Sequence, residues 1–230
     1  MATRDSILGM CFDLDSRPPI PPIAGAAVDG QRTELHASDG TRFLAFDAVA
    51  GAPSGAGLVV LPDVRGLHHF YEELALRFAE RGYDAVAIDY FGRTAPTDDR
   101  GESFEFMPHV EQTTFESEVL DIKAAADHLR SRGVHHVFTV GFCMGGRLSF
   151  LCATLDELGL AGVIGFYGGV VGEGRGGMPA PLELAQAGQF RAPVLGLFGG
   201  TDSGIPRDTI DAFGDALTDA GVQSDLVTYP

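Results

Sequence analysis

The chain has 230 residues, of which 45% are hydrophobic, and its 32 acidic and 16 basic residues give a formal charge of −16. This length suits one sizeable hydrophobic core, and the acidic balance disfavours nucleic acid and anionic membranes as partners. No apolar run approaches the length of a membrane span, the start is unlike a signal peptide, and three cysteines without close pairing fit a reducing compartment, so we expect a cytoplasmic protein.

Prolines mark the first part of the chain, at positions 18, 19, 21 and 22. Because proline lacks a backbone N–H and fixes φ, this composition excludes a regular helix or a central strand. We therefore predict that residues 1–30 form an extended arm on the surface, with a linker to a partner as the alternative. Residues 31–230 are predicted to form a single domain.

From residue 31 onward, short apolar runs alternate with helical patterns, which is typical of buried parallel strands and their connecting helices. The predicted strands are Arg32–Ala37, Arg42–Val49, Gly57–Leu61, Asp84–Asp89, His135–Val140, Gly162–Phe166, Val194–Phe198 and Gln223–Thr228. The predicted helices are His69–Arg81, Thr114–Arg132, Met144–Asp156 and Arg207–Ala220, and glycines that favour left-handed caps follow three of them, at 82, 133 and 221. This order predicts an α/β fold with a mostly parallel eight-stranded sheet and helices on both faces. The glycine-rich Gly168–Gly177 is interpreted as a mobile loop beside the site.

Gly141–Gly145 lie between a predicted strand and a predicted helix and read Gly-Phe-Cys-Met-Gly. This is the nucleophile elbow of α/β-hydrolases with cysteine in place of serine, and its glycines relieve crowding where a strand turns at once into a helix. The free N–H groups of the helix N-terminus favour a thiolate at Cys143. We therefore predict that Cys143 is a nucleophile. Cys152, among leucines on the following helix, is predicted to be a small buried hydrophobe, and Cys11 is given no role.

A thiol nucleophile also needs donors for an oxyanion, a base, and an acid that orients the base. The backbone amides of Met144 and Val64 are the predicted oxyanion donors, because one follows the nucleophile and the other follows the strand Gly57–Leu61. Asp202 follows a later strand and is the predicted orienting acid, since the order nucleophile then acid matches α/β-hydrolases. The alternative is that Asp202 caps the next helix, for which Asp208 is better placed.

Five segments in this order resemble the dienelactone hydrolase family, a cysteine branch of the α/β-hydrolases. They are Leu61–Gly66, Asp89–Pro96, Val140–Gly146, Phe166–Gly168 and Phe198–Asp202, and the similarity runs from about Arg42 to the last residue. The resemblance implies an eight-stranded sheet flanked by helices, and hydrolysis of small lactones or esters like that of carboxymethylenebutenolidase. It implies no cofactor and no metal ion. The oligomeric state is left open.

The resemblance also assigns individual roles. Asp63 stands where family members usually carry a glutamate that accepts a hydrogen bond from the resting thiol and takes its proton; here the side chain is one methylene shorter. Arg93 matches the arginine that grips a substrate carboxylate, which fits an anionic substrate. The alternative for Arg93 is a surface ion pair with Asp98, Asp99 or Asp89. Tyr90, Phe91 and Tyr167 are candidates for the pocket lining, with simple packing as the alternative.

The general base that the resemblance implies is a histidine after the last strand, and the printed sequence ends at Pro230, before that position. We interpret residues 31–230 as a hydrolase domain that ends before its histidine and its closing helix. His68 and His69, which follow the Asp63 loop, are substitutes for the base, although they are better placed to start the next helix. The remaining histidines are poor candidates.

Two other functions fit parts of the sequence. A class I glutamine amidotransferase also carries cysteine in such an elbow, but no histidine and glutamate separated by one residue follow Cys143. A non-catalytic relative that binds a ligand or partner would explain both the aspartate at position 63 and the missing histidine. A histidine encoded within several codons of Pro230 would favour the enzyme.

Overall fold

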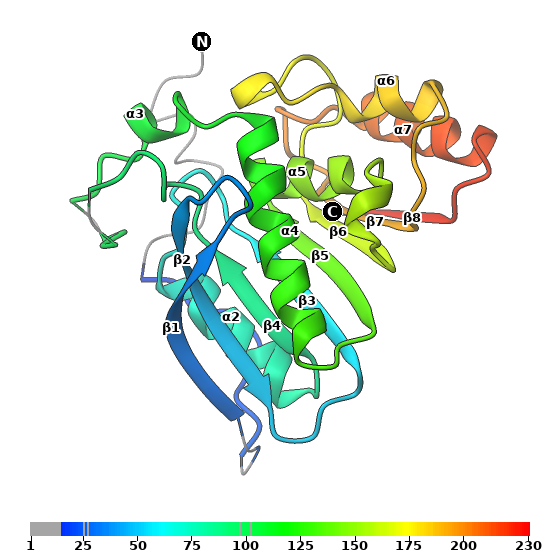
Figure 1. Cartoon of the computed structure of the whole chain (residues 1–230). Coiled ribbons are helices and arrows are strands. Elements are labelled where there is room, and N and C mark those ends of the chain that lie inside the picture. Colours follow the sequence, from blue (N-terminus) through cyan, green and yellow to red (C-terminus); the bar gives the residue numbers. More distant parts are fainter. Residues whose placement is uncertain (1–14, 25, 27, 97, 102) are drawn as a thin grey trace.

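The computed structural model describes residues 15–230 except 25, 27, 97 and 102 (Figure 1). One sheet runs through the molecule in the order β1-β2-β4-β3-β5-β6-β7-β8. Its strands are β1 (Val28–His36), β2 (Arg42–Ala50), β3 (Ala56–Leu61), β4 (Asp84–Ile88), β5 (His136–Phe142), β6 (Gly162–Phe166), β7 (Val194–Gly199) and β8 (Ser224–Tyr229). All eight predicted strands are confirmed, with boundaries that shift by a few residues.

The sheet is parallel from β4 to β8, while β1 pairs with β2 and β2 with β4 in antiparallel fashion. Every residue of β4 is buried, and so is every residue of β3 after Ala56. This explains why both strands are continuous apolar runs, since a parallel strand in the middle of such a sheet is covered on both faces. The predicted α/β architecture is therefore confirmed.

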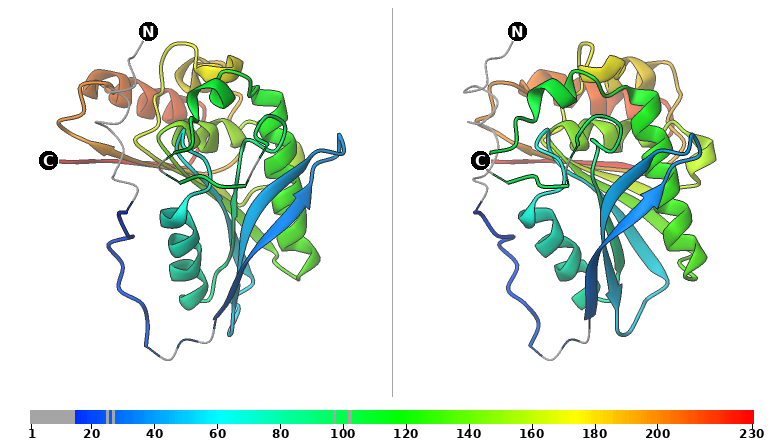
Figure 2. Two further views of the ribbon diagram at one scale, coloured as in Figure 1. Left: turned by 90° about the vertical axis from the view of Figure 1, so that its left-hand side faces the viewer. Right: turned by 60° about the vertical axis from the view of Figure 1, so that its left-hand side comes forward.

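Helices cover the two faces of the sheet unequally. Their bounds are α2 (His69–Glu80), α3 (Met107–Val110), α4 (Phe115–Ser131), α5 (Met144–Cys152), α6 (Pro181–Gln186) and α7 (Arg207–Asp219), with 3₁₀ turns η1 (Asp156–Leu158) and η2 (Arg175–Gly177). Buried side chains of α2 form one core with β2, β3 and β4, while those of α4, α5 and α7 form the larger core on the opposite face. Figure 2 shows α2 and α4 on opposite sides of the sheet.

Three of the four predicted helices are found with nearly the predicted bounds, and the third of the series is shorter. The segment predicted as Met144–Asp156 is helical only to Cys152, and a separate 3₁₀ turn follows at Asp156. The glycines that follow α2, α4 and α7 have φ values of +88°, +92° and +72°, which confirms the predicted left-handed caps. The short helices α3 and α6 were not predicted.

The N-terminal arm is described only in part. Residues 15–24 contain no helix or strand, and the Ile23 N–H donates a hydrogen bond of 3.0 Å to Glu80 Oε2 on α2. Residues 1–14, and with them Cys11, lie outside the described residues. No helix among the residues that the structure describes is long and apolar enough to cross a membrane.

Because β3 to β8 are parallel, the loops that follow them emerge at one edge of the sheet. That edge receives Asp63 and Val64 after β3, Cys143 after β5, Tyr167 after β6 and Asp202 after β7. Loops at the carboxyl ends of parallel strands are the usual place for a site in such a sheet. The candidate residues from distant parts of the sequence are thus collected there.

Candidate active site

The elbow has the geometry that its glycines predict. β5 ends at Phe142, α5 begins at Met144, and Cys143 between them has φ 56° and ψ −114°, a left-handed conformation that is rare outside glycine. A Cβ at Gly141 would lie 1.8 Å from the carbonyl oxygen of Gly145, and a Cβ at Gly145 would lie 2.2 Å from that of Leu61. Both positions therefore exclude any side chain, and the strained turn at Cys143 is held by the packing around it.

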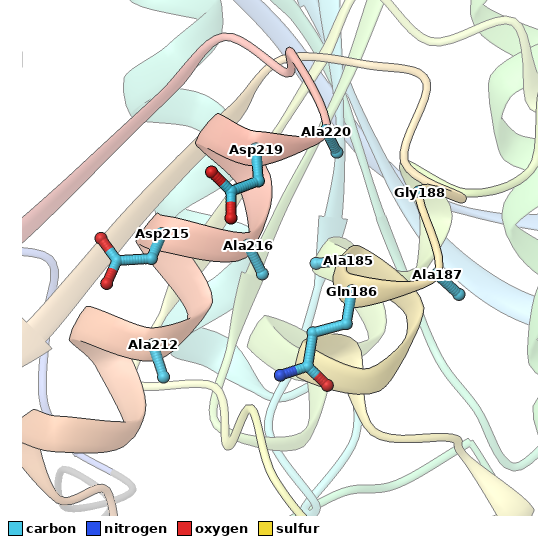
Figure 3. A pocket seen from close by; sticks show the side chains of 9 residues that line it. All are labelled: Ala185, Gln186, Ala187, Gly188, Ala212, Asp215, Ala216, Asp219 and Ala220. Carbon is cyan, nitrogen blue, oxygen red and sulfur yellow. The ribbon is translucent and has the colours of Figure 1, made fainter.

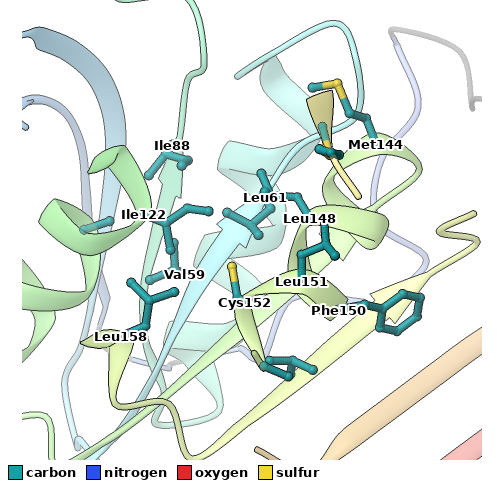
Figure 4. Close-up of a cluster of buried hydrophobic side chains, with 14 of the residues drawn as sticks. Val59, Leu61, Ile88, Ile122, Met144, Leu148, Phe150, Leu151, Cys152 and Leu158 are labelled. Atoms are coloured by element: carbon teal, nitrogen blue, oxygen red, sulfur yellow. The ribbon is translucent and has the colours of Figure 1, made fainter. Parts of the chain in front are cut away.

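The two cysteines that the structure describes, Cys143 and Cys152, differ in their surroundings. Cys143 is half-buried, and its backbone N–H donates to the carbonyl oxygen of Phe166 over 3.0 Å. Cys152 is packed among the leucines of the core (Figure 4), and burial together with the nearby Glu118 raises its thiol pKa. The prediction that Cys152 is a small buried hydrophobe is confirmed. Cys143 is the one with a surface that a substrate can reach.

Two backbone N–H groups beside the elbow lack acceptors. Val64 and Met144 are 3% and 7% exposed, and within the described part of the chain neither N–H donates a hydrogen bond. The loop that carries Val64 lies against the elbow, because a Cβ at Gly145 would also lie 2.4 Å from the carbonyl oxygen of Pro62. Buried N–H groups are nearly always paired, so two unpaired ones near a thiol suit a developing oxyanion.

Asp63 is fully buried and engaged by its neighbours. Arg65 donates to both of its oxygens, from Nε to Oδ1 at 2.9 Å and from Nη2 to Oδ2 at 2.6 Å, and the Arg65 backbone N–H also donates to Oδ1. The hydroxyl of Tyr71 donates to Oδ2 over 2.9 Å and accepts from the Asp63 N–H. His68, the residue before α2, lies with Nε2 3.8 Å from Oδ2.

These contacts decide the charge of Asp63. Burial raises its pKa, but the hydrogen bonds and charges of Arg65 and His68 outweigh that effect and hold the pKa well below its ordinary value. A carboxylate this stable is a weak proton acceptor, and both of its oxygens already accept bonds that shape the loop on either side of Val64. The role of Asp63 as proton acceptor for the thiol stays a prediction.

Asp202 lies in the turn after β7, half-buried, and its Oδ1 accepts a 2.8 Å hydrogen bond from the Gly204 N–H. It does not cap α7, whose N-cap is Pro206, and Asp208 lies inside the first turn of that helix. The Gly200 N–H donates to the carbonyl oxygen of Tyr229 over 2.6 Å, so the end of β8 lies beside this turn. The carboxylate is thus held at the sheet edge next to the last strand.

Arg93 is already ion-paired. Its Nη1 donates to Asp121 Oδ2 at 2.7 Å and its Nη2 to Asp39 Oδ2 at 3.0 Å. The alternative prediction, that Arg93 forms an ion pair, is therefore confirmed, but its partners are not the predicted Asp98, Asp99 or Asp89. Of those, Asp89 pairs with Arg100 and Asp98 with Arg42. Because Asp39 is partly exposed, a substrate carboxylate would have to compete with it, and the substrate role of Arg93 stays a prediction.

The three aromatic candidates lie in different surroundings. Tyr90 is 1% exposed and its hydroxyl donates to the Pro62 carbonyl oxygen at 2.8 Å, so it supports the loop that carries Val64. Phe91 is fully buried against Phe104 and His109. Tyr167 is half-buried with φ 39°, directly after β6 and edge-on to the ring of Phe142. Of the three, Tyr167 is the one placed to contact a molecule at Cys143.

Several residues of the site were not predicted. Arg65, Tyr71 and Arg147 anchor the loops around Cys143, and the available signals were the Asp-x-Arg spacing after β3 and the arginine four residues after the nucleophile. A surface pocket between α6 and α7 (Figure 3) is lined by alanines, Gln186, Asp215 and Asp219, and none of the candidate residues lies in it. The chemistry at the sheet edge, rather than this hollow, identifies the candidate site.

Comparison with known proteins agrees with this geometry. Residues 46–230 match the dienelactone hydrolase family. A protein of Methylorubrum extorquens named "Putative carboxymethylenebutenolidase" is 32% identical over 178 residues, which cover 75% of this chain and 60% of that relative's length. A Klebsiella pneumoniae crystal structure described as "Putative Dienelactone Hydrolase" superposes with a TM-score of 0.77 at 28% identity, over 89% of this chain and 86% of the other.

The α/β-hydrolase fold extends to more distant structures. An acylaminoacyl peptidase in complex with a chloromethyl ketone superposes with a TM-score of 0.67 at 17% identity, over 88% of this chain and 37% of the peptidase. At that identity the likeness concerns the fold alone.

Proposed function

The chain belongs to the dienelactone hydrolase family, and on that premise we propose that it hydrolyses a small lactone or ester through an acyl-enzyme on Cys143. The observation that carries the proposal is a pair of backbone N–H groups, on the buried residues Val64 and Met144, that have no acceptor among the described residues and lie beside the strained elbow of Cys143. That arrangement suits acyl transfer, because it can stabilise negative charge that appears only during the reaction.

In the acylation step, the substrate carbonyl oxygen accepts from the Val64 and Met144 N–H groups. The Cys143 sulfur attacks the carbonyl carbon as a thiolate, and the S–C bond forms while the C=O bond opens to an oxyanion. The oxyanion then collapses and the bond from carbon to the ester oxygen breaks. The leaving oxygen takes up the proton that the Cys143 thiol had given to the general base, and it departs as an alcohol, or stays attached in the acyl chain when the substrate is a lactone.

In the deacylation step, water attacks the thioester carbon and the C–S bond breaks, which releases a carboxylic acid and restores the thiol. The proposal assigns the base for this step to a histidine after β8, oriented by Asp202. It is supported by the position of the end of β8, where Tyr229 accepts from the Gly200 N–H two residues before Asp202. Together these residues would form a Cys-His-Asp triad.

In this mechanism Asp63 holds the loop that carries Val64, and it does not act on the Cys143 thiol. Its bonds to Arg65 and Tyr71 fix residues 63–65, and with them the direction of the Val64 N–H. Tyr167 contributes a wall of the pocket. Arg93 is proposed to attract an anionic substrate when Asp39 is displaced. We place the protein in the cytoplasm, since three cysteines without close pairing in the sequence fit a reducing compartment.

The test compares hydrolysis of 4-nitrophenyl acetate and of a small lactone by the wild type, C143A and C152A. Removal of a nucleophile that works as a unit with other groups typically costs about 10³-fold or more. We expect that loss in C143A, whereas C152A, which removes the buried thiol, should retain activity. Equal activity in C143A and the wild type would rule out the proposed mechanism.

A further inference from the structure

The loop between β6 and α6, residues 167–180, starts directly beside the nucleophile. The Cys143 N–H donates to Phe166, the last residue of β6, and the start of the loop packs on the first turn of α5. A Cβ at Gly146 would lie 2.4 Å from the Phe166 carbonyl oxygen, and a Cβ at Gly168 would lie 2.4 Å from the Arg147 nitrogen. The conformation of the loop therefore affects the space around Cys143.

One guanidinium group holds both ends of this loop. Arg147, on the first turn of α5, is 7% exposed and donates to backbone carbonyl oxygens from two separate stretches. Nη1 donates to Gly169 at 3.3 Å and Val171 at 3.1 Å, and Nη2 donates to Gly172, to Met178 at 3.3 Å and to Pro179 at 2.7 Å. From its sequence we interpreted Gly168–Gly177 as a mobile loop, whereas these bonds tie the residues before and after its tip to the helix of the nucleophile.

Carbonyl oxygens, rather than a carboxylate, compensate this buried charge. Within the described residues no ion pair of Arg147 is found. Burial lowers the pKa of its guanidinium, and the charge of Glu183 opposes that effect. A planar guanidinium with five N–H donors is suited to several acceptors at once, which a lysine ammonium cannot match in geometry. Loss of the guanidinium would release carbonyl groups on both sides of the loop tip together.

The loop also leaves room for this group and reaches a second helix. Gly174 lies so close that a Cβ there would stand 2.7 Å from Arg147 Nε. A Cβ at Gly176 would lie 2.8 Å from the carbonyl oxygen of Thr113, just before α4. In Figure 1 the yellow segment accordingly arches above α5 toward the upper end of α4. The loop thus lies near the N-terminal end of α5, which Cys143 precedes.

We infer that Arg147 is a positioning residue that fixes the loop of residues 167–180 over the site and so restricts the acyl groups that Cys143 accepts to small ones. The effect on acyl groups rests on the proposed function, because it requires that Cys143 forms an acyl-enzyme. The fixing of the loop itself does not. Without Arg147 the loop opens, larger acyl chains enter, and small ones lose the wall that holds them.

The first experiment compares R147M with R130M. Arg130 is a matched control, since it also donates to backbone carbonyl oxygens, those of Leu158 and Gly159. It lies in the last turn of α4, whereas the loop contacts the residues that precede the first turn. Hydrogen exchange of residues 169–179 should rise at least tenfold in R147M and stay unchanged in R130M. Alkylation of Cys143 by iodoacetamide should become severalfold faster. Both readouts are independent of hydrolysis, so they test the loop even if the proposed function fails.

The second readout is specificity. The kcat/KM ratio of 4-nitrophenyl acetate to 4-nitrophenyl hexanoate should fall about tenfold in R147M, mainly through a higher KM for the acetate, and R147K should recover only part of the ratio. If Arg147 only stabilised the fold, R147M would lower kcat/KM equally for both substrates.

If R147M does not fold, G174A and G169A replace it. A Cβ at Gly174 crowds the guanidinium, whereas one at Gly169 has Arg147 Nη1 as its nearest atom at 3.8 Å, an ordinary contact. G174A should therefore loosen the loop and G169A should not. Exchange and alkylation in R147M or G174A that match the wild type would overturn the inference, as would an unchanged acetate-to-hexanoate ratio in a variant whose loop has opened.

Discussion

Replacement of Glu118 by glutamine should make the stability of this protein less dependent on pH. Glu118 lies in the first turn of α4, is 1% exposed, and neither of its carboxyl oxygens has a hydrogen-bond partner among the described residues. Burial, together with repulsion from Asp121, raises its pKa from 4.5 to about 8. The folded protein therefore keeps a proton on Glu118 that the unfolded chain releases above pH 4.5.

The sign and size of the effect follow from this difference in bound protons. The contribution of Glu118 is fully present below pH 4.5 and is lost as the pH rises toward 8. Each pH unit well inside that window costs about 1.4 kcal/mol of unfolding free energy, and the slope flattens near either pKa, so between pH 5 and pH 8 the wild type should lose roughly 3.5 kcal/mol through this one group. E118Q carries no such charge and should avoid that loss, although the buried amide adds a cost that does not depend on pH.

Urea unfolding at pH 5, 6, 7 and 8 measures the effect. The difference in unfolding free energy between E118Q and the wild type should shift in favour of E118Q at each step. E116Q is the matched control, because Glu116 is exposed on the same turn of α4. Parallel pH dependence in E118Q and the wild type would refute the reasoning.

Three further substitutions test the site. D202N should lower steady-state turnover of 4-nitrophenyl acetate by about 10²-fold or more while the acylation burst keeps its amplitude, because a misoriented base slows deacylation; loss of the burst would contradict this assignment. D63N leaves the Arg65 guanidinium buried without its carboxylate and should cost about 3 kcal/mol in urea unfolding. Since the folded-state pKa of Asp63 is depressed, that difference should be present near neutral pH and shrink as the pH falls through the acid range, and a difference that grows in acid would contradict it. R93Q should raise KM about tenfold for an ester that carries a carboxylate and leave KM for a neutral ester unchanged; equal effects would remove the role of Arg93.

Most of the fold was predictable because its signals are local. The middle strands of the series, β3 to β7, are short apolar runs bounded by polar or glycine residues, and glycines mark the ends of α2, α4 and α7. The elbow at Cys143 was predictable for the same reason, since its glycines are required by contacts within a few residues and with the neighbouring strand end. The helices α3 and α6 were missed because each is too short for a periodic pattern.

The ion-pair partners of Arg93 could not be predicted, because they come from distant segments. The predicted partners of Arg93 were nearby aspartates. In the structure it bonds to Asp39, 54 residues earlier, and to Asp121, 28 residues later. A charge pattern along the sequence does not encode which of 32 acidic residues will face a given arginine. Arg147 was overlooked for a related reason, since its acceptors are backbone carbonyl oxygens and carry no mark in the sequence.

The most direct test of the account is capture of the acyl-enzyme. The protein is mixed with 4-nitrophenyl acetate, quenched in acid within milliseconds, digested and examined by mass spectrometry. The account predicts one acetyl group on the peptide that contains Cys143, formed in step with the burst of 4-nitrophenol and missing in C143A. Hydrolysis of the ester with no acetyl group at Cys143, or with the acetyl group on another residue, would contradict it.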